Sequence, residues 1–187
     1  MKRKCGRGMI IKNGCVTLRA MEERDINLLF EMINSPEIEK ALGNFCLPVS
    51  ETQQREWVLN YRNTEKQIRL MIELSNGETI GVIMLYDIDM KNGTAEVGYK
   101  ISAPRENRIR GDMTDALRGM LDYAFYELRL QCVIAHSLSD NEASIRLLEK
   151  VGFNREGLLR QRVYQSGQYC DLISFSVLKG EYEALQV

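Results

Sequence analysis

The chain has 187 residues, 44% hydrophobic and 27% charged, and its 25 basic and 26 acidic side chains leave a formal net charge of −1. This composition is typical of a single globular domain and excludes a disordered or fibrous chain. The even charge balance argues against nucleic acid as a partner. A membrane partner is not expected either, because the longest apolar stretch, residues 80–86, is far shorter than the ~20 residues of a spanning helix.

The amino-terminal residues 1–12 are basic but lack the apolar core of a signal peptide. We expect a disordered tail over residues 1–12 and a single domain over residues 13–187, with Met9 as an alternative translation start. The cysteines are odd in number and widely spaced without a Cys-x-x-Cys pair, which indicates a reducing cytoplasm and no metal site. They are Cys5, Cys15, Cys46, Cys132 and Cys170.

The first half of the chain predicts a strand, then helices, then a strand meander. Residues 16–19 alternate like a strand, and residues 23–33 place apolar side chains on one helical face. A short helix follows from Pro36 to about residue 42, and a capping box at Ser50 starts another. Residues 69–74, 79–86 and 95–101 read as antiparallel strands, joined by Asn-Gly turns at residues 76–77 and 92–93.

The second half predicts helix, strand, helix and hairpin. Residues 111–126 form the strongest amphipathic helix, residues 132–138 a strand, and residues 141–151 a helix that ends at Gly152. Residues 157–164 and 169–177 complete a final hairpin. The chain is therefore expected to be an α/β (α+β) single domain, with a mixed, mostly antiparallel sheet flanked by helices.

One loop predicts an anion site. Arg105, Arg108 and Arg110 follow a strand and precede the helix that begins near Gly111. Free backbone N–H groups and the helix dipole favour a pyrophosphate at such a place. The loop is neither a Walker loop nor a Rossmann fingerprint, and a solvated basic loop would have the same composition.

Several motifs occur together in a familiar order. They are Ala95-Glu96-Val97-Gly98-Tyr99, Arg108-x-x-Gly111, Thr114-Asp115-Ala116-Leu117, and a helix from Asn141-x-x-Ser144 to Gly152-Phe153 followed by Glu156-Gly157. In this order and spacing, which covers residues 16–178, they resemble the GNAT superfamily of N-acetyltransferases. The resemblance is to the branch that includes ribosomal-protein amino-terminal and spermidine acetyltransferases. It implies a GNAT-like domain with splayed central strands, and transfer of an acetyl group from acetyl-CoA directly to a primary amine in a ternary complex.

The resemblance also implies where acetyl-CoA binds. Backbone N–H groups of residues 109–114 would face the phosphates, and the strand at 97–101 would line the pantetheine arm and donate hydrogen bonds to the developing oxyanion. The cofactor-binding residues are then Val97, Tyr99, Ile101, Arg108, Ile109, Arg110, Gly111, Asp112, Met113, Thr114, Asn141 and Ser144.

Two of these positions have alternative interpretations, and a third, Asp112, has an unfavourable charge. Met113 stands where the family has Gly or Ala, so its side chain either crowds the pyrophosphate or points into the core. Asp112 adds a negative charge beside the phosphates. Asn141 is favoured as a cofactor contact, although Asn is also a good helix cap.

For the chemistry, Glu96 is the best candidate for a general base, acting directly or through water; the alternative is a rim carboxylate that only orients the substrate. Many family members have a Tyr at the position of Leu148 to protonate the leaving thiolate, and this chain does not. The single histidine, His136, could titrate near neutral pH, although a lone strand histidine is more often structural. Cys132 and Cys170 have no adjacent base, which disfavours an acyl-cysteine route.

The acceptor is left open between a protein amino terminus and a small amine. Tyr164 and Tyr169 are expected as walls of its pocket or as a cross-strand pair. Early glutamates would either attract a cationic acceptor or form solvated helix faces: Glu31, Glu37, Glu39 and Glu51. A non-catalytic acyl-CoA-binding sensor is the alternative function, and both a monomer and a homodimer fit the sequence.

Overall fold

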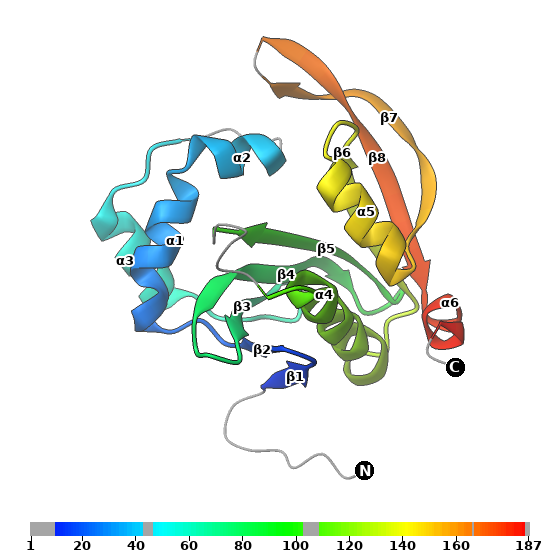
Figure 1. The fold of residues 1–187 in the computed structure, drawn as a ribbon, viewed down its shortest axis with the longest axis horizontal. Helices are drawn as coiled ribbons and strands as arrows, with labels where there is room; N and C mark the ends of the chain where they lie inside the picture. Colours follow the sequence, from blue (N-terminus) through cyan, green and yellow to red (C-terminus); the bar gives the residue numbers. More distant parts are fainter. Residues whose placement is uncertain (1–9, 43–46, 103–108, 166, 186–187) are drawn as a thin grey trace.

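The computed structural model describes residues 10–42, 47–102, 109–165 and 167–185. These residues build one eight-stranded sheet in the order β1-β2-β3-β4-β5-β6-β8-β7 (Figure 1). All neighbouring strands are antiparallel except β5 and β6. The strands are β1 (Ile11–Asn13), β2 (Val16–Arg19), β3 (Ile68–Leu74), β4 (Thr79–Asp89), β5 (Thr94–Ile101), β6 (Cys132–Leu138), β7 (Asn154–Gln165) and β8 (Gln168–Leu178). The predicted mixed, mostly antiparallel sheet is confirmed.

Helices cover both faces of the sheet. They are η1 (Glu23–Asp25), α1 (Ile26–Ile33), α2 (Pro36–Leu42), α3 (Glu51–Asn60), α4 (Asp112–Asp122), the π-helical turn η3 (Tyr123–Glu127), α5 (Glu142–Val151) and α6 (Lys179–Ala184). Helices α1 and α3 pack with Met71 and Val82 in one cluster, whereas α4 and α5 pack with Leu70 and Ile72 in the main core. Since successive strand residues point to opposite faces, these two clusters lie on opposite sides of the sheet. Within the described ranges, no helix is both long and apolar enough to cross a bilayer.

Two segments differ from the sequence expectation. Ile11 and Lys12, assigned above to the tail, belong to β1 and pair with Leu18 and Thr17 of β2. The chain also ends in a helix, α6, which the pattern did not predict. Its Tyr182 is buried against Phe125 with ring centroids 5.4 Å apart, so one aromatic side chain holds this short helix on the core.

The two central strands separate partway along their length. Only Thr94, Ala95 and Glu96 of β5 pair with β6. Beyond this point β5 continues to Ile101 and β6 to Leu138, each paired only with its other neighbour. The splayed central strands expected from the family resemblance are therefore present, and they open the sheet in the middle.

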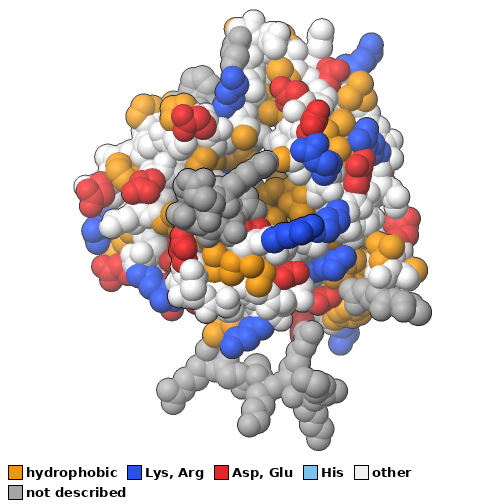
Figure 2. Space-filling model, viewed as in Figure 1, with side chains coloured by type: hydrophobic (Ala, Val, Ile, Leu, Met, Phe, Trp, Pro, Cys, Tyr) orange, Lys and Arg blue, Asp and Glu red, His pale blue; other side chains and the backbone are white. Residues whose placement is uncertain are grey.

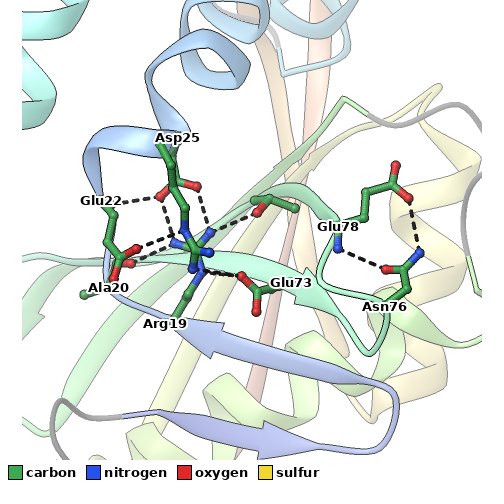
Figure 3. Close-up of polar contacts among 9 residues, drawn as sticks. Arg19, Ala20, Glu22, Asp25, Glu73, Asn76 and Glu78 are labelled. Atoms are coloured by element: carbon green, nitrogen blue, oxygen red, sulfur yellow. Dashed lines mark hydrogen bonds and ion pairs between the residues drawn. The ribbon is translucent and has the colours of Figure 1, made fainter.

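A buried ion cluster fixes the start of the first helices (Figure 3). Arg19 donates to both carboxylate oxygens of Asp25, at 2.8 and 2.7 Å, and its Nε donates to Glu73 at 2.6 Å. It also donates to Thr79 Oγ1 and to the carbonyl of Ala20. These charge-assisted hydrogen bonds, Asp25 above all, raise the pKa of Arg19 and join the start of α1 to strands β2 and β3.

The last two strands form a long hairpin whose outer strand, β7, is an edge of the sheet. In Figure 1 this hairpin extends beyond the body of the molecule. The pairing of β7 with β8 shifts register at two places, and Gln161 has a positive φ of 51°. Most side chains of β7 are exposed.

Candidate active site

The opening between β5 and β6 leads into a cavity of about 1360 Å³. In Figure 2 a hollow with hydrophobic side chains lies near the middle of the face shown. All of the predicted site residues that the structure describes line this cavity: Glu96, Val97, Tyr99, Ile101, Ile109, Arg110, Gly111, Asp112, Met113, Thr114, Asn141 and Ser144. Arg105 and Arg108 lie outside the described residues.

The cavity passes through the sheet. Val97 and Ala135 belong to the main core on the α4 and α5 side. Their strand neighbours Glu96 and His136 point to the opposite face, which α1 and α3 cover. All four residues line the same cavity. A molecule bound near the start of α4 can therefore reach a second molecule on the other face through the gap between β5 and β6.

The start of α4 has a backbone geometry compatible with the anion cradle that the sequence predicts. Gly111 caps the helix with a φ of 97°, and a Cβ atom placed there would meet no atom of the described residues within 4 Å. The backbone therefore faces open space at the positive end of the helix dipole, which suits a phosphate group.

Two of the backbone N–H groups expected at the phosphates have partners within the chain. That of Asp112 donates to the Ile109 carbonyl at 3.0 Å, and that of Met113 donates to Asp112 Oδ1 at 2.5 Å. Asp112 is 3% exposed, so this carboxylate is part of the helix start rather than a charge on the loop surface. The expectation of phosphate contacts through backbone N–H groups then rests on the remaining residues of the 109–114 segment. The side chain of Met113 packs in the main core, as its helical position indicated.

The start of α5 is held by side-chain hydrogen bonds. Asn141 Oδ1 accepts from the N–H of Ser144 at 3.1 Å, and its Nδ2 donates to the carbonyl of Ala41 in α2 at 3.2 Å. The oxygen thus has the capping role that the sequence left as the alternative. The nitrogen joins the start of α5 to α2. The Ser144 hydroxyl lies 2.8 Å from that of Tyr99 across the cavity wall. Burial raises the pKa of Tyr99, whose hydroxyl therefore stays protonated.

Glu96 is the centre of a small polar cluster. Its Oε1 accepts a short hydrogen bond from the hydroxyl of Tyr86, the residue paired with it on β4, and lies 2.8 Å from His136 Nδ1. Burial, and then the bond to Glu96, raise the pKa of Tyr86 above its usual range. Glu96 is thus held between a phenol and an imidazole at the point where β5 and β6 separate.

Helix α2 lies beside the same cavity and is tied to it on two sides. Glu39, 3% exposed, forms an ion pair with Lys100 of β5 at 2.5 Å, and Ala41 accepts the hydrogen bond from Asn141 described above. Glu39 therefore neither lies on a solvated helix face nor attracts a cationic acceptor, because it is buried and paired with Lys100. Glu37 of the same helix lines the cavity, whereas Glu31 and Glu51 are exposed.

The tyrosines of the last hairpin do not line the cavity. Tyr164 and Tyr169 are each 64% exposed and contact one another edge to face, with ring centroids 5.1 Å apart. They therefore form the cross-strand pair that the sequence offered as the alternative; since successive strand residues point to opposite faces, Tyr164 points away from the cavity that Val163 lines. Val163 of β7 and Leu172 of β8 contribute to the lining instead.

Tyr86 is the site residue that the sequence analysis missed. A two-residue turn at Asn92 and Gly93 would pair residue 91 with residue 94 and set Tyr86 opposite Tyr99. The last pair before the turn is instead Asp89 with Thr94, so the turn has four residues, 90–93, and moves the register by two; the irregularity between Tyr86 and Asp89 adds one more and brings Tyr86 opposite Glu96. The positive φ of Asp87, 50°, marks this irregularity.

Comparison with known proteins agrees with the motifs. A family model described as an acetyltransferase (GNAT) domain matches residues 16–154. The SPbeta prophage-derived uncharacterized N-acetyltransferase YokL of Bacillus subtilis (strain 168) is 33% identical over 168 residues, which cover 90% of this chain and 92% of that protein. The "Putative ribosomal N-acetyltransferase YdaF" of the same organism is 33% identical over 176 residues, 91% of this chain and 95% of that one.

Solved structures share the fold. The crystal structure of spermidine N-acetyltransferase from Vibrio cholerae, in complex with CoA and spermine, superimposes with a TM-score of 0.82 at 24% identity. The match covers 91% of this chain and 99% of that one. The expected arrangement of sheet and helices is thus found in an enzyme crystallised with CoA.

Proposed function

The chain belongs to the GNAT family of acetyltransferases, and from this premise we propose that it transfers an acetyl group from acetyl-CoA directly to a primary amine while both are bound. The observation that carries the proposal is the cavity that passes through the opened sheet. On one face it begins at the Gly111 cradle, and on the other it reaches Glu96. Two substrates entering from opposite faces would meet at the gap, so no covalent acyl-enzyme is needed.

The residues present fit the phosphate-bearing donor. Gly111 has the positive φ and the empty Cβ position that a closely approaching phosphate requires, and Thr114 and Arg110 line the cavity beside it. When bound, acetyl-CoA supplies a reactive thioester. Beyond Glu96 the β5 backbone has no β6 partner among the described pairs, which supports residues 97–101 as hydrogen-bond donors to the developing oxyanion.

The leaving thiolate needs a proton source other than residue 148. Leu148 lines the cavity and is 1% exposed. Ser144 lies one helical turn before it on the same face of α5, and its hydroxyl is paired with that of Tyr99. This hydroxyl pair can donate a proton where other family members use a tyrosine, so the departure at Leu148 does not by itself favour a non-catalytic sensor.

For the acceptor, the lining on the Glu96 side favours a protein amino terminus over a polyamine. The charged side chains there are of both signs, with Lys100 paired to Glu39: Glu37, Asp87, Glu96, Lys66, Arg69 and Lys100. A polyamine with several positive charges would meet the basic groups unfavourably. A peptide has one ammonium group and uncharged amide groups, which suits a mixed lining.

The proposed setting is a reducing cytoplasm. The three cysteines that the structure describes, Cys15, Cys132 and Cys170, are unpaired. Burial raises the pKa of Cys15 and of Cys132, which keeps both thiols protonated and unreactive. This supports a role without cysteine chemistry.

The test is release of free CoA from acetyl-CoA in the presence of a panel of amines: peptides with free Ala or Ser amino termini, spermidine and an aminoglycoside. We expect turnover with peptides. Turnover with spermidine alone would overturn the acceptor class, and CoA binding by calorimetry without turnover on any amine would favour the sensor.

Gly111→Glu tests the cofactor site. The new side chain places a negative charge and bulk in the cradle, at a φ that side chains rarely adopt, so the affinity for CoA should fall at least tenfold. Gly77→Glu is the matched control, because Gly77 also has a positive φ and open space but lies in a surface turn away from the cavity. An unchanged affinity in Gly111→Glu would refute the site.

A further inference from the structure

We propose that the proton of the acceptor ammonium is taken by His136 Nε2, and that Glu96 and Tyr86 act as positioning residues that hold the imidazole in the basic tautomer. The inference rests on the proposed acetyl transfer and names the atom that receives the proton. It assigns the central role to the histidine that the sequence pattern treated as structural.

The hydrogen bonds fix the tautomer. A carboxylate only accepts hydrogen bonds, and Glu96 Oε1 already accepts one from Tyr86. The 2.8 Å contact between the same oxygen and His136 Nδ1 therefore requires the proton on Nδ1. Neutral imidazole then has its lone pair on Nε2, which is the atom that can accept a proton.

Tyr86 keeps Glu96 from moving. Its hydroxyl stays protonated, because burial and Glu96 both raise its pKa, and it can only donate to the carboxylate. A glycine makes this contact possible: a Cβ at Gly98 would lie 3.2 Å from Cε1 of the Tyr86 ring. The strand thus leaves room for the phenol that orients Glu96.

The position of His136 suits proton transfer. It lies two residues past Ile134, the last β6 residue paired with β5, and so stands at the gap where the two faces of the sheet communicate. Its side chain is 28% exposed and lines the cavity, and no described residue bonds to Nε2. On β8 the paired residue is Ser174, which carries no charge, so Glu96 is the charged group bonded to the ring.

The proton balance is simple. The N–H bond of the acceptor ammonium breaks, its electron pair stays on nitrogen, and an Nε2–H bond forms. The imidazolium is stabilised by the Glu96 carboxylate and later returns the proton to solvent through its exposed edge. The neutral amine then forms the bond to the acetyl carbon, and the C–S bond breaks with its electron pair on sulfur. The thiolate takes a proton from the Ser144–Tyr99 hydroxyl pair, which is restored by the second proton that the nitrogen loses as it becomes an amide.

The tautomer can be read in the free protein. The sequence has one histidine, so ¹⁵N NMR of the untagged chain gives a single pair of imidazole signals. At a pH where the ring is neutral, we expect a protonated Nδ1 and an unprotonated Nε2, and loss of this preference in Glu96→Ala. Glu149→Ala, at a surface glutamate outside the cavity, should leave the signals unchanged. A protonated Nε2 in the wild-type protein would overturn the proposal.

Kinetics distinguish His136 from Glu96 as the base. His136→Gln should lower kcat by about 10²- to 10⁴-fold with the KM for acetyl-CoA unchanged. Glu96→Gln should also lower kcat, but combining it with His136→Gln should add nothing further, since Glu96 acts through the imidazole. Near-wild-type kcat in a folded His136→Gln protein would refute the inference. Absence of turnover by the wild-type enzyme on every amine would instead refute the proposed function.

Discussion

Two polar clusters on the same sheet use charge in opposite ways. Around Arg19, the five N–H groups of the guanidinium all have acceptors: Asp25, Glu73, Thr79 and the Ala20 carbonyl. Around Glu96, the imidazole of His136 uses Nδ1, while Nε2 has no partner in the described part of the chain. All donors of the Arg19 cluster are paired, whereas the Glu96 cluster has one ring nitrogen that no described residue bonds.

This difference separates stability from function. A buried charge that loses a partner is costly, so a fully satisfied cluster resists change and fixes the helices that follow it. The Glu96 cluster, whose imidazole and carboxylate are 28% and 21% exposed, has one ring nitrogen that no described residue bonds, so it gives up some stabilisation but can bind a proton. Three substitutions test the distinction, in order of expected effect.

The largest effect is expected for Asp25→Ala. Removing this carboxylate leaves Arg19 buried with only part of its acceptors, and the free energy of unfolding should fall by about 3–5 kcal/mol. Urea denaturation measures the change. Glu96→Gln should cost less, about 1 kcal/mol, because the amide oxygen can still accept the hydrogen bond from Tyr86. Equal losses in the two variants would contradict the comparison.

An intermediate effect is expected for Tyr86→Phe. The variant keeps the ring and removes one hydrogen bond to Glu96, so kcat should fall about tenfold while unfolding changes by about 1 kcal/mol. Steady-state kinetics with a peptide acceptor give the first number and urea denaturation the second. Tyr126→Phe, on the surface, is the matched control. Wild-type kcat in Tyr86→Phe would mean that Glu96 needs no orientation.

The smallest effect is expected for Arg146→Ala. Arg146 pairs with Glu142 at 2.7 Å on the exposed face of α5, and both side chains are well solvated, at 66% and 76% exposure. Such a pair contributes at most about 0.5 kcal/mol, and kcat should not change. A loss comparable with that of Asp25→Ala would show that burial is not what distinguishes the clusters.

Local patterns were sufficient for most of the fold. Hydrophobic periodicity and turn residues predicted most strands and helices from Val16 onward, because these features depend on neighbouring residues. The splayed strands were implied by the resemblance to the GNAT superfamily instead. Helix α6 was missed, since Tyr182 is held by residues far away in sequence: its ring contacts Phe125, and its hydroxyl donates to Asp122 and to the carbonyl of Arg118.

The site was harder to predict because it depends on register and on partners across strands. The pairing of Tyr86 with Glu96 follows from a four-residue turn in place of a two-residue one, and from an irregularity near Asp87 that no turn motif signals. His136 was singled out but considered structural, because the sequence alone does not show that its Nδ1 faces a carboxylate. Asn141 illustrates the converse: its family position suggested a ligand contact, and its local geometry is that of a cap.

The irregular outer strand β7 has a consequence for association between molecules. A long, straight edge strand offers a row of backbone groups to which another chain can add. Here two register shifts and the positive φ of Gln161 interrupt that row, and Arg160 and Arg162 stand exposed beside it. These irregularities of β7 therefore disfavour edge-to-edge aggregation through the hairpin.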